Sequence, residues 1–158
     1  MKFGAAILMV AFLALYAFAG TRVVVSLLPE AARPDAEVCT NIALNVNAAR
    51  LQALTISVSF DACETNEVLV ALGADADGDG DLSVDEADVV FGCDCGAWYR
   101  ADLRTGAVET ATTNALVIGK GQFVPAWNRL KVVRRGLGEI GETVEKDEEY
   151  VRFDIRIR

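Results

Sequence analysis

The sequence contains no histidine, and this absence excludes several classes of function. Ser–His and Cys–His nucleophile pairs, histidine-ligated catalytic zinc and the HExxH metalloprotease motif all require an imidazole. Basic residues are also few: Lys and Arg number 15 against 23 for Asp and Glu, which gives a formal charge of −8. A nucleic-acid partner needs a basic face that neutralises phosphates. We therefore expect no nucleic-acid partner and none of these catalytic centres.

Internal repeats, low-complexity tracts and a long amphipathic helical pattern after residue 36 are missing as well. The chain has 158 residues, which is enough for one domain of ordinary size but not for two full cores. Apolar residues make up 53% and charged residues 24%. This composition is too apolar for a disordered chain and too mixed for a protein with several membrane spans, so it predicts one globular domain.

One long uncharged run does occur, at the N-terminus. Lys2 precedes an apolar stretch from Phe3 to Tyr16, and Ala17 and Ala19 are small residues that fit a cleavage site before Gly20. A positive start, an apolar run and a small-residue cleavage site are the three parts of a secretory signal peptide. The segment therefore predicts export.

An uncleaved anchor is the alternative for the same run. As a hydrophobic helix, residues 3–20 are at the lower length limit for a single membrane span. In both cases the following chain lies outside the cytoplasm: secreted, periplasmic or anchored to the membrane by the N-terminal segment. We expect a signal peptide or membrane anchor over residues 1–19, a linker with two prolines over 20–36, and a β domain over 37–158.

Apolar and polar residues alternate with a period of two in the remaining chain. Such alternation gives a strand one buried and one solvated face. It occurs at residues 42–46, 54–60, 68–72 and 151–157, and shorter candidate strands lie at 89–91, 116–118 and 130–133. Six to eight short strands separated by turns predict an all-β fold, either an antiparallel β-sandwich or an open barrel.

The first two of these strands can be aligned as a hairpin. A register that places Leu44 opposite Val58 puts the apolar residues of both strands on one face. The same register places Cys39 opposite Cys63. The alignment therefore favours a Cys39–Cys63 disulfide, although a slip of two residues would preserve the shared apolar face and lose the cysteine pairing.

An even number of cysteines is usual in disulfide-bonded proteins outside the cytoplasm. We therefore expect two disulfides. If Cys39 does not pair with Cys63, both can pair with the C-x-C motif. A four-thiolate zinc site is not favoured, because the spacing lacks the CxxC pairs that such sites use. The four residues are Cys39, Cys63, Cys93 and Cys95.

The most informative stretch is Asp75–Glu86, which matches D-x-[DN]-x-[DN]-G-x5-E at every fixed position. Calcium is a hard cation that takes six to eight oxygen ligands. Asp75, Asp77 and Asp79 present carboxylates from alternate positions of a tight loop, and Gly80 allows its sharp turn. The spacing therefore predicts that three carboxylates converge on one ion.

The second half of the loop completes the predicted coordination shell. Asp81 offers its backbone carbonyl, Ser83 acts through a water molecule, and Glu86 closes the shell with both carboxylate oxygens. Calcium is the predicted cofactor. The predicted metal ligands are Asp75, Asp77, Asp79, Asp81, Ser83 and Glu86.

This loop resembles the EF-hand calcium loop and, more closely, the calcium loops of exported bacterial proteins such as dockerins. The resemblance covers Asp75–Glu86 alone. EF-hands and dockerins usually pair two loops between helices, whereas this chain has one loop and the residues on each side read as strands. We therefore expect a loop that bridges two strands. A sensor, in contrast, needs a pair of helices that opens.

No constellation of residues points to catalysis, and we expect no enzyme activity. The predicted function is a calcium-binding β domain in which calcium is structural, with a role in adhesion, assembly or scaffolding and a surface protein or glycan as partner. The alternative is a carbohydrate-binding module that uses Trp98, Tyr99 or Trp127 as a stacking platform, although core or sheet-edge packing is the favoured explanation of these aromatics.

Basic residues near the C-terminus lie among acidic ones. Cross-strand ion pairing on the solvated face of a sheet accounts for such a mixture. The basic residues concerned are Arg134, Arg135, Arg152, Arg156 and Arg158.

Overall fold

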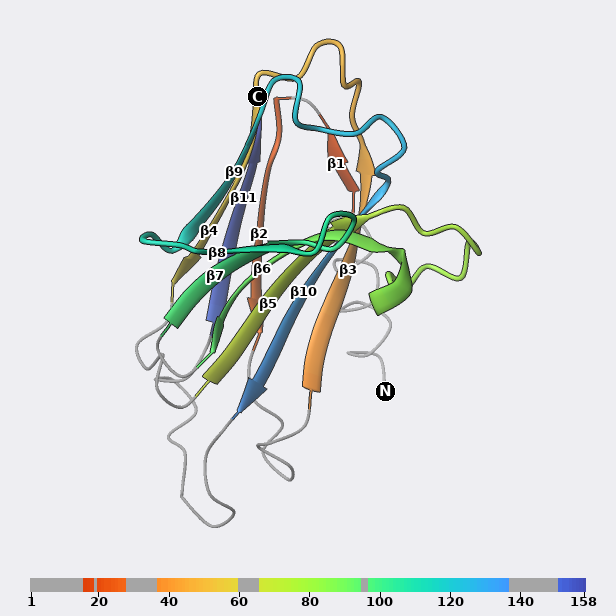
Figure 1. Ribbon diagram of the computed structural model, residues 1–158. Coiled ribbons are helices and arrows are strands. Elements are labelled where there is room, and N and C mark those ends of the chain that lie inside the picture. Colours follow the sequence, from red (N-terminus) through yellow and green to blue (C-terminus); the bar gives the residue numbers. More distant parts are fainter. Residues whose placement is uncertain (1–15, 19, 28–36, 60–65, 95–96, 137–150) are drawn as a thin grey trace.

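The computed structural model describes residues 16–18, 20–27, 37–59, 66–94, 97–136 and 151–158. These residues form two β-sheets that face each other, and the acidic loop projects from one side (Figure 1). Apart from one short 3-10 turn, η2 (Val84–Glu86), the described part of the chain contains no helix. The predicted all-β fold is therefore confirmed, as two sheets with a shared core.

The larger sheet has seven strands in the order β1-β3-β10-β5-β6-β7-β8. All neighbours in it are antiparallel except β1 and β3, which run parallel. In sheet order, the strands are β1 (Tyr16–Phe18), β3 (Glu37–Asn45), β10 (Arg129–Gly136), β5 (Asn66–Gly73), β6 (Ala87–Asp94), β7 (Ala97–Asp102) and β8 (Ala107–Thr110).

The smaller sheet has four strands in the order β2-β11-β4-β9, all antiparallel to their neighbours. These strands are β2 (Arg22–Leu27), β11 (Val151–Ile157), β4 (Ala53–Ser59) and β9 (Ala115–Gly119). Edge strand β2 and its neighbour β11 lie far apart in the sequence, so this sheet depends on long-range pairing.

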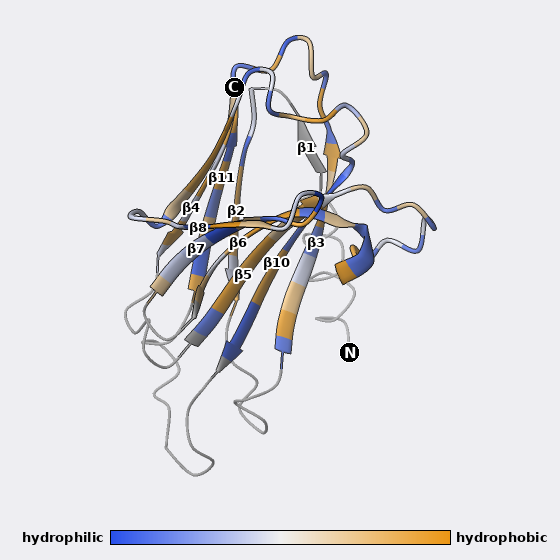
Figure 2. Cartoon of the chain, viewed as in Figure 1, coloured by the Kyte–Doolittle hydropathy of each residue, from blue (hydrophilic) through white to orange (hydrophobic). Residues whose placement is uncertain are grey.

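The core lies between the two sheets and follows the predicted alternation (Figure 2). On β4, Leu54, Ile56 and Val58 are buried, and on β11 Phe153 and Ile155 are buried. Residues of the larger sheet, including Ile42, Val70 and Phe91, close the same cluster from the other side. Burial of each large apolar side chain contributes about 1.5–3 kcal/mol, which makes this shared layer the main source of stability.

The expected N-terminal hydrophobic helix is not supported. Tyr16–Phe18 form strand β1, which extends the edge of the larger sheet beside β3. Periodicity cannot separate a buried helix from a strand in an uncharged apolar run, and a sheet edge offers unpaired backbone groups to such a segment. The rest of the expected signal or span, residues 1–15 and 19, lies outside the described residues.

Part of the expected linker, residues 20–36, is also a strand. Arg22–Leu27 form β2, which pairs with β11 and buries Val23 and Leu27 in the core. The sequence V-V-V-S-L has strong β propensity, which outweighs its position beside a predicted cleavage site. The two prolines of the expected linker lie outside the described residues.

The predicted hairpin between residues 42–46 and 54–60 is wrong. Leu44 lies on β3 and Val58 on β4, and these strands belong to opposite sheets. Strand β3 pairs with β10, and β4 pairs with β11 and β9. Both strands do point their apolar residues at the same core, but they do so across the sandwich. A shared apolar face is therefore no evidence of pairing.

The prediction for the basic residues holds in part. Arg135 pairs with Glu67 of the neighbouring strand at 2.6 Å, as predicted, whereas Arg156 lies 3.5 Å from Asp154 of its own strand, β11. Arg134, however, is buried, with 1% of its surface exposed. It shares the inward face of β10 with Leu130 and Val132, because the alternation continues past the last apolar residue.

Candidate metal centre

The acidic loop joins β5 to β6, which are antiparallel neighbours in the middle of the larger sheet. Gly73 at the end of β5 is paired with Ala87 at the start of β6, so the loop leaves and re-enters the sheet at the same rung. The prediction of a loop between two strands is confirmed. The turn η2 at its end is too short to act as the second helix of an EF-hand.

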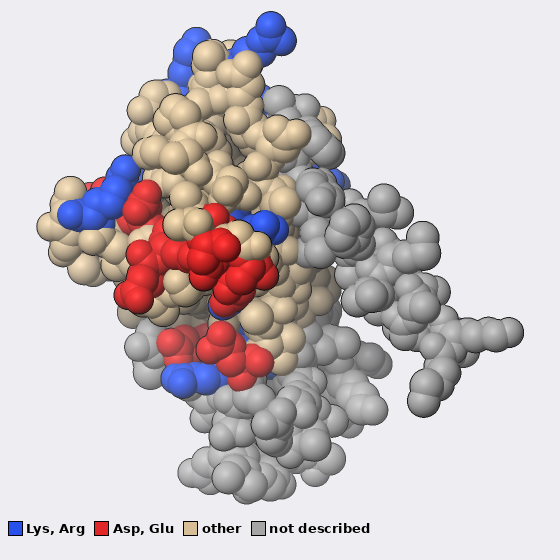
Figure 3. Space-filling model, turned by 90° about the vertical axis from the view of Figure 1, so that its right-hand side faces the viewer, with Lys and Arg blue, Asp and Glu red and all other residues tan. Residues whose placement is uncertain are grey.

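Four carboxylates converge in this loop. One oxygen from each of Asp75, Asp77, Asp79 and Glu86 lies within 4.8 Å of the others. Figure 3 shows one large acidic patch on the face of the molecule that carries the loop, with smaller acidic groups beside basic residues elsewhere on this face. The structure thus brings together four of the six predicted ligands, and all four are oxygen donors.

The Asp81 side chain makes its contacts outside this cluster. The Asp81 carboxylate accepts a hydrogen bond from the Asn41 side chain and pairs with Lys131, both at 2.9 Å. This position fits the prediction that Asp81 offers only its backbone carbonyl. Ser83 is exposed, and its backbone N–H donates to Glu86 Oε2 at 3.0 Å, which positions that carboxylate at the start of η2.

Hydrogen bonds from backbone N–H groups shape the first half of the loop. The Asp75 carboxylate accepts from Gly78 at 3.0 Å and from Gly80 at 2.8 Å. Asp77 and Asp79 each accept from the N–H two residues ahead, at 3.1 and 2.9 Å. Gly78 and Gly80 have φ of 71° and 85°, a left-handed conformation that glycine adopts without steric cost. The loop is therefore wound with its carboxylates turned inward.

Crowding of these carboxylates changes how they ionise. Burial acts to raise the pKa of Asp75, but hydrogen bonds from the Gly80 N–H and from the protonated form of Asp77, together with the charge of Arg129, outweigh it and lower the pKa. For Asp77, the N–H of Asp79 acts to lower the pKa, but the hydrogen bond with Asp75, burial and the charge of Asp79 together raise it. The charged form of Asp75 is thus favoured, whereas the charged form of Asp77 is disfavoured. A bound cation would stabilise the charged form of Asp77.

The loop is fastened to the larger sheet by polar side chains that the motif does not contain. Asn128 Oδ1 accepts from the Asp75 N–H at 2.9 Å. Asn41, besides its bond to Asp81, accepts from the Leu82 N–H at 3.0 Å. No sequence signal marks Asn41 or Asn128 as part of the site, because only folding brings β3 and the start of β10 beside the loop.

An apolar contact adds to this fastening. Leu82, at the eighth position of the loop, has 2% of its surface exposed and packs on Ala71 and Ala87, with Val90 beside them. This small cluster lies on the outer face of the larger sheet, away from the main core. It explains why an apolar residue occupies the eighth position of an otherwise acidic loop.

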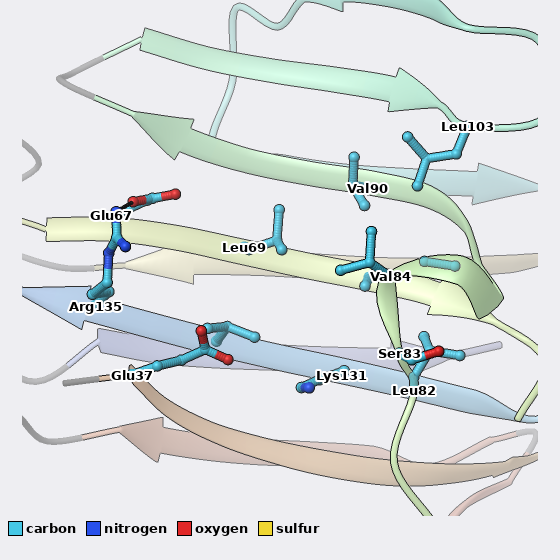
Figure 4. A pocket seen from close by; sticks show the side chains of 13 residues that line it. Glu37, Glu67, Leu69, Leu82, Ser83, Val84, Val90, Leu103, Lys131 and Arg135 are labelled. Atoms are coloured by element: carbon cyan, nitrogen blue, oxygen red, sulfur yellow. Dashed lines mark hydrogen bonds and ion pairs between the residues drawn. The ribbon is translucent and has the colours of Figure 1, made fainter.

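Beside this cluster lies a shallow hollow of about 340 Å³ on the outer face of the larger sheet (Figure 4). Leu69, Ala71 and Val90 form its apolar floor, Val84 of η2 closes one end, and the paired Glu67 and Arg135 lie at the other end. The remaining lining residues are Glu37, Leu82, Ser83, Ala87, Leu103, Lys131 and Val133.

The tryptophans do not form a stacking platform together. Trp127 has only 3% of its surface exposed, donates its indole N–H to Asp88 at 2.7 Å and packs edge-on against Phe123. Trp98 is partly buried and stacks on Phe91, with ring centroids 5.2 Å apart. Trp127 is therefore a packing residue, and one face of the Trp98 ring is covered by Phe91.

The cysteines differ from the favoured pairing. Cys39 is a free thiol on β3 whose residue is exposed overall, and partial desolvation of the thiol raises its pKa. The favoured Cys39–Cys63 disulfide is therefore wrong, because the hairpin that would have paired them does not exist. Cys93 is disulfide-bonded. Cys63 and Cys95 lie outside the described residues, and the expectation of two disulfides stays a prediction.

Among the described residues, no helix has both the length and the apolar character that a membrane crossing requires. Residues 49–92 match the family described as the aspartyl beta-hydroxylase N-terminal region, a range that includes the acidic loop but is well under half of the chain. No curated protein matches the sequence. Among solved structures, the chain is similar to one from tomato aspermy virus, with 9% identity and a TM-score of 0.38 over 87% of this chain and 76% of that chain.

Proposed function

We propose that this protein is an exported or membrane-anchored, non-catalytic β domain that binds one calcium ion in the loop Asp75–Glu86. The observation that carries the proposal is the convergence of carboxylate oxygens from Asp75, Asp77, Asp79 and Glu86 within 4.8 Å, in a loop that fits the calcium motif at every fixed position. Calcium prefers an oxygen-only donor set of this kind.

The role of the ion in this proposal is structural. Four carboxylates held this close repel one another, and a divalent cation removes that repulsion. Since the loop connects two central strands, the same ion would stabilise the sheet. At free calcium of about one hundred times the dissociation constant, binding contributes roughly 2.7 kcal/mol, a large share of the stability of an ordinary domain.

Adhesion, assembly or scaffolding is the cellular role that we propose for such a domain, with a surface protein or glycan as partner. A sensor role is not favoured, because the described residues contain no helix pair for the ion to open. We do not advance the carbohydrate-binding alternative, because Trp127 is buried and one face of Trp98 is covered by Phe91.

Titration calorimetry on the full chain tests the proposal directly. We expect heat of binding for one Ca²⁺ per chain, with a dissociation constant in the range of about 10⁻⁴ to 10⁻³ M that is common for extracellular modules. We also expect EDTA to lower the melting temperature and calcium to restore it. Glu86→Gln should abolish both effects, because it removes the carboxylate that closes the coordination shell.

Asp85→Asn is the matched control, since Asp85 is an exposed loop carboxylate outside the converging cluster. This variant should retain calcium binding. The proposal fails if the wild-type chain shows neither heat with millimolar calcium nor a change in melting temperature with EDTA.

A further inference from the structure

Arg129, the first residue of β10, places a cation against the acidic loop. Its Nη2 lies 3.5 Å from Asp75 Oδ2, and its position in the sheet is fixed by pairing with Ala43 of β3 on one side and Gly73 of β5 on the other. Because Gly73 is also the last strand residue before the loop, the guanidinium stands where the loop begins.

The contact is partly withdrawn from solvent. The Asp75 side chain is 2% exposed and the Arg129 side chain 22% exposed, and charges in such a place are screened less than charges at the surface. At 3.5 Å the pair is an electrostatic contact and not a short hydrogen bond. The Nε of Arg129 is buried and makes no hydrogen bond among the described residues, and the contact of its head group with the acidic loop is the one between Nη2 and Asp75.

Lys131, two residues further along the same face of β10, is engaged differently. Its ammonium group lies 2.9 Å from Asp81, whose side chain is outside the converging cluster. Lys131 therefore holds the loop without touching a carboxylate that would coordinate the metal. Arg129, in contrast, contacts Asp75, which is both a member of the cluster and its most buried carboxylate.

We propose that Arg129 is a built-in competitor of calcium: it neutralises Asp75 in the metal-free loop and thereby weakens the affinity of the loop for the ion. This inference rests on the proposed calcium site. An ion held by Asp75 shares that carboxylate with the guanidinium, and the two positive charges repel each other. The same cation keeps the metal-free loop closed by reducing the repulsion among its carboxylates. Arg129 thus affects affinity and metal-free stability in opposite directions.

Arg129→Met tests this inference in the full chain, with the dissociation constant for Ca²⁺ measured by calorimetry and the melting temperature measured in EDTA. Removal of the charge should tighten calcium binding about tenfold, equivalent to about 1.4 kcal/mol. It should also lower the melting temperature in EDTA. Arg129→Lys retains the positive charge and should restore most of the wild-type behaviour. Arg135→Met is the matched control, because Arg135 pairs with Glu67 at the far end of the same strand.

A merely structural role for Arg129 predicts the opposite sign, since a loosened loop would bind calcium more weakly. Unchanged or weaker binding in Arg129→Met would therefore overturn the inference while leaving the proposed site intact. If neither the wild type nor the variant binds calcium, the proposed function fails and the inference fails with it. Should Arg129→Met not fold, Arg129→Gln serves instead, because it keeps a hydrogen-bond donor while removing the charge.

Discussion

Gly73 is a single residue whose lack of a side chain is necessary for the acidic loop to close. A Cβ built at this position would lie 2.2 Å from the backbone oxygen of Glu86, far closer than two such atoms can approach. The last residue of the loop thus packs directly over the last residue of β5. Neither hydrophobic periodicity nor the calcium motif reveals this requirement, because it arises from the meeting of two backbone segments.

We expect Gly73→Ala to destabilise the fold by about 1–3 kcal/mol, the usual range for an inserted methyl group that forces the backbone to shift. Urea unfolding, with and without calcium, measures the change. Gly119→Ala is the control: Gly119 also ends a strand, but a Cβ there would lie 3.4 Å from Oε1 at the end of the flexible Gln122 side chain. Equal effects from the two substitutions would contradict the steric explanation.

The candidate ligands could be predicted from the sequence, whereas the residues that anchor the loop could not. Asp75 and Glu86 stand at fixed spacing inside one segment, so a local motif predicts that they converge. Asn41 and Arg129 lie far from the loop in sequence and reach it only because β10 pairs with β5 and β3 pairs with β10. Local spacing carries no information about such contacts, and the sequence therefore predicted the carboxylates but not their anchors.

At the scale of elements, Asn41 connects strand β3 to the acidic loop. Its amide donates to the Asp81 side chain and accepts from the Leu82 backbone N–H. Asn41→Ala should cost about 1–3 kcal/mol in unfolding free energy, because it leaves a partly buried backbone donor without its partner. Denaturant unfolding at saturating calcium measures this. Asn45→Ala, an exposed position at the end of the same strand, should be close to wild type.

The strand predictions show the strength and the limit of periodicity. The runs at 54–60 and 151–157 correspond to β4 and β11, because two-residue alternation directly reports which residues face a core. Strand β8 was missed, since all four of its residues are exposed and give no alternation. The predicted hairpin is wrong because β3 and β4 face a common core from opposite sheets. The alternating apolar residues of each strand face the core in this arrangement, as they would in a hairpin, so the alternation cannot distinguish the two.

At the scale of the whole molecule, an ion pair connects the beginning of the described chain to its end. Arg22 of β2 donates two hydrogen bonds to Asp154 of β11, at 2.9 and 2.6 Å. These contacts hold edge strand β2 on the smaller sheet, next to a strand that lies more than one hundred residues away in sequence. Pairing over such a separation cannot be inferred from either segment alone, which is why residues 22–27 were expected to belong to a linker.

This pair should make stability depend on pH. Hydrogen bonds from Arg22 lower the pKa of Asp154 below its ordinary value of 3.8. A carboxyl group with a lowered pKa in the folded state contributes stability above its unfolded pKa, and this contribution is lost as the pH falls through the folded pKa. Wild type should therefore be more stable than Asp154→Asn near neutral pH, and the difference in melting temperature should shrink below about pH 4.

Thermal unfolding of both proteins across this pH range measures the difference. Glu109→Gln, on exposed strand β8, is the control and should track the wild type at every pH. A gap between wild type and Asp154→Asn that stayed constant down to the lowest pH would show that the substitution acts through something other than this ion pair.

The pairing of Gly73 with Ala87 has a consequence for how such a protein can evolve or be engineered. Because the segment between them departs from and returns to a single rung of a β-hairpin, exchanging it for a tight two-residue turn would leave the registers of all other strands unchanged. If the loop binds calcium as we propose, metal dependence is a trait that can be gained, lost or transplanted with one short segment, without redesign of the rest of the fold.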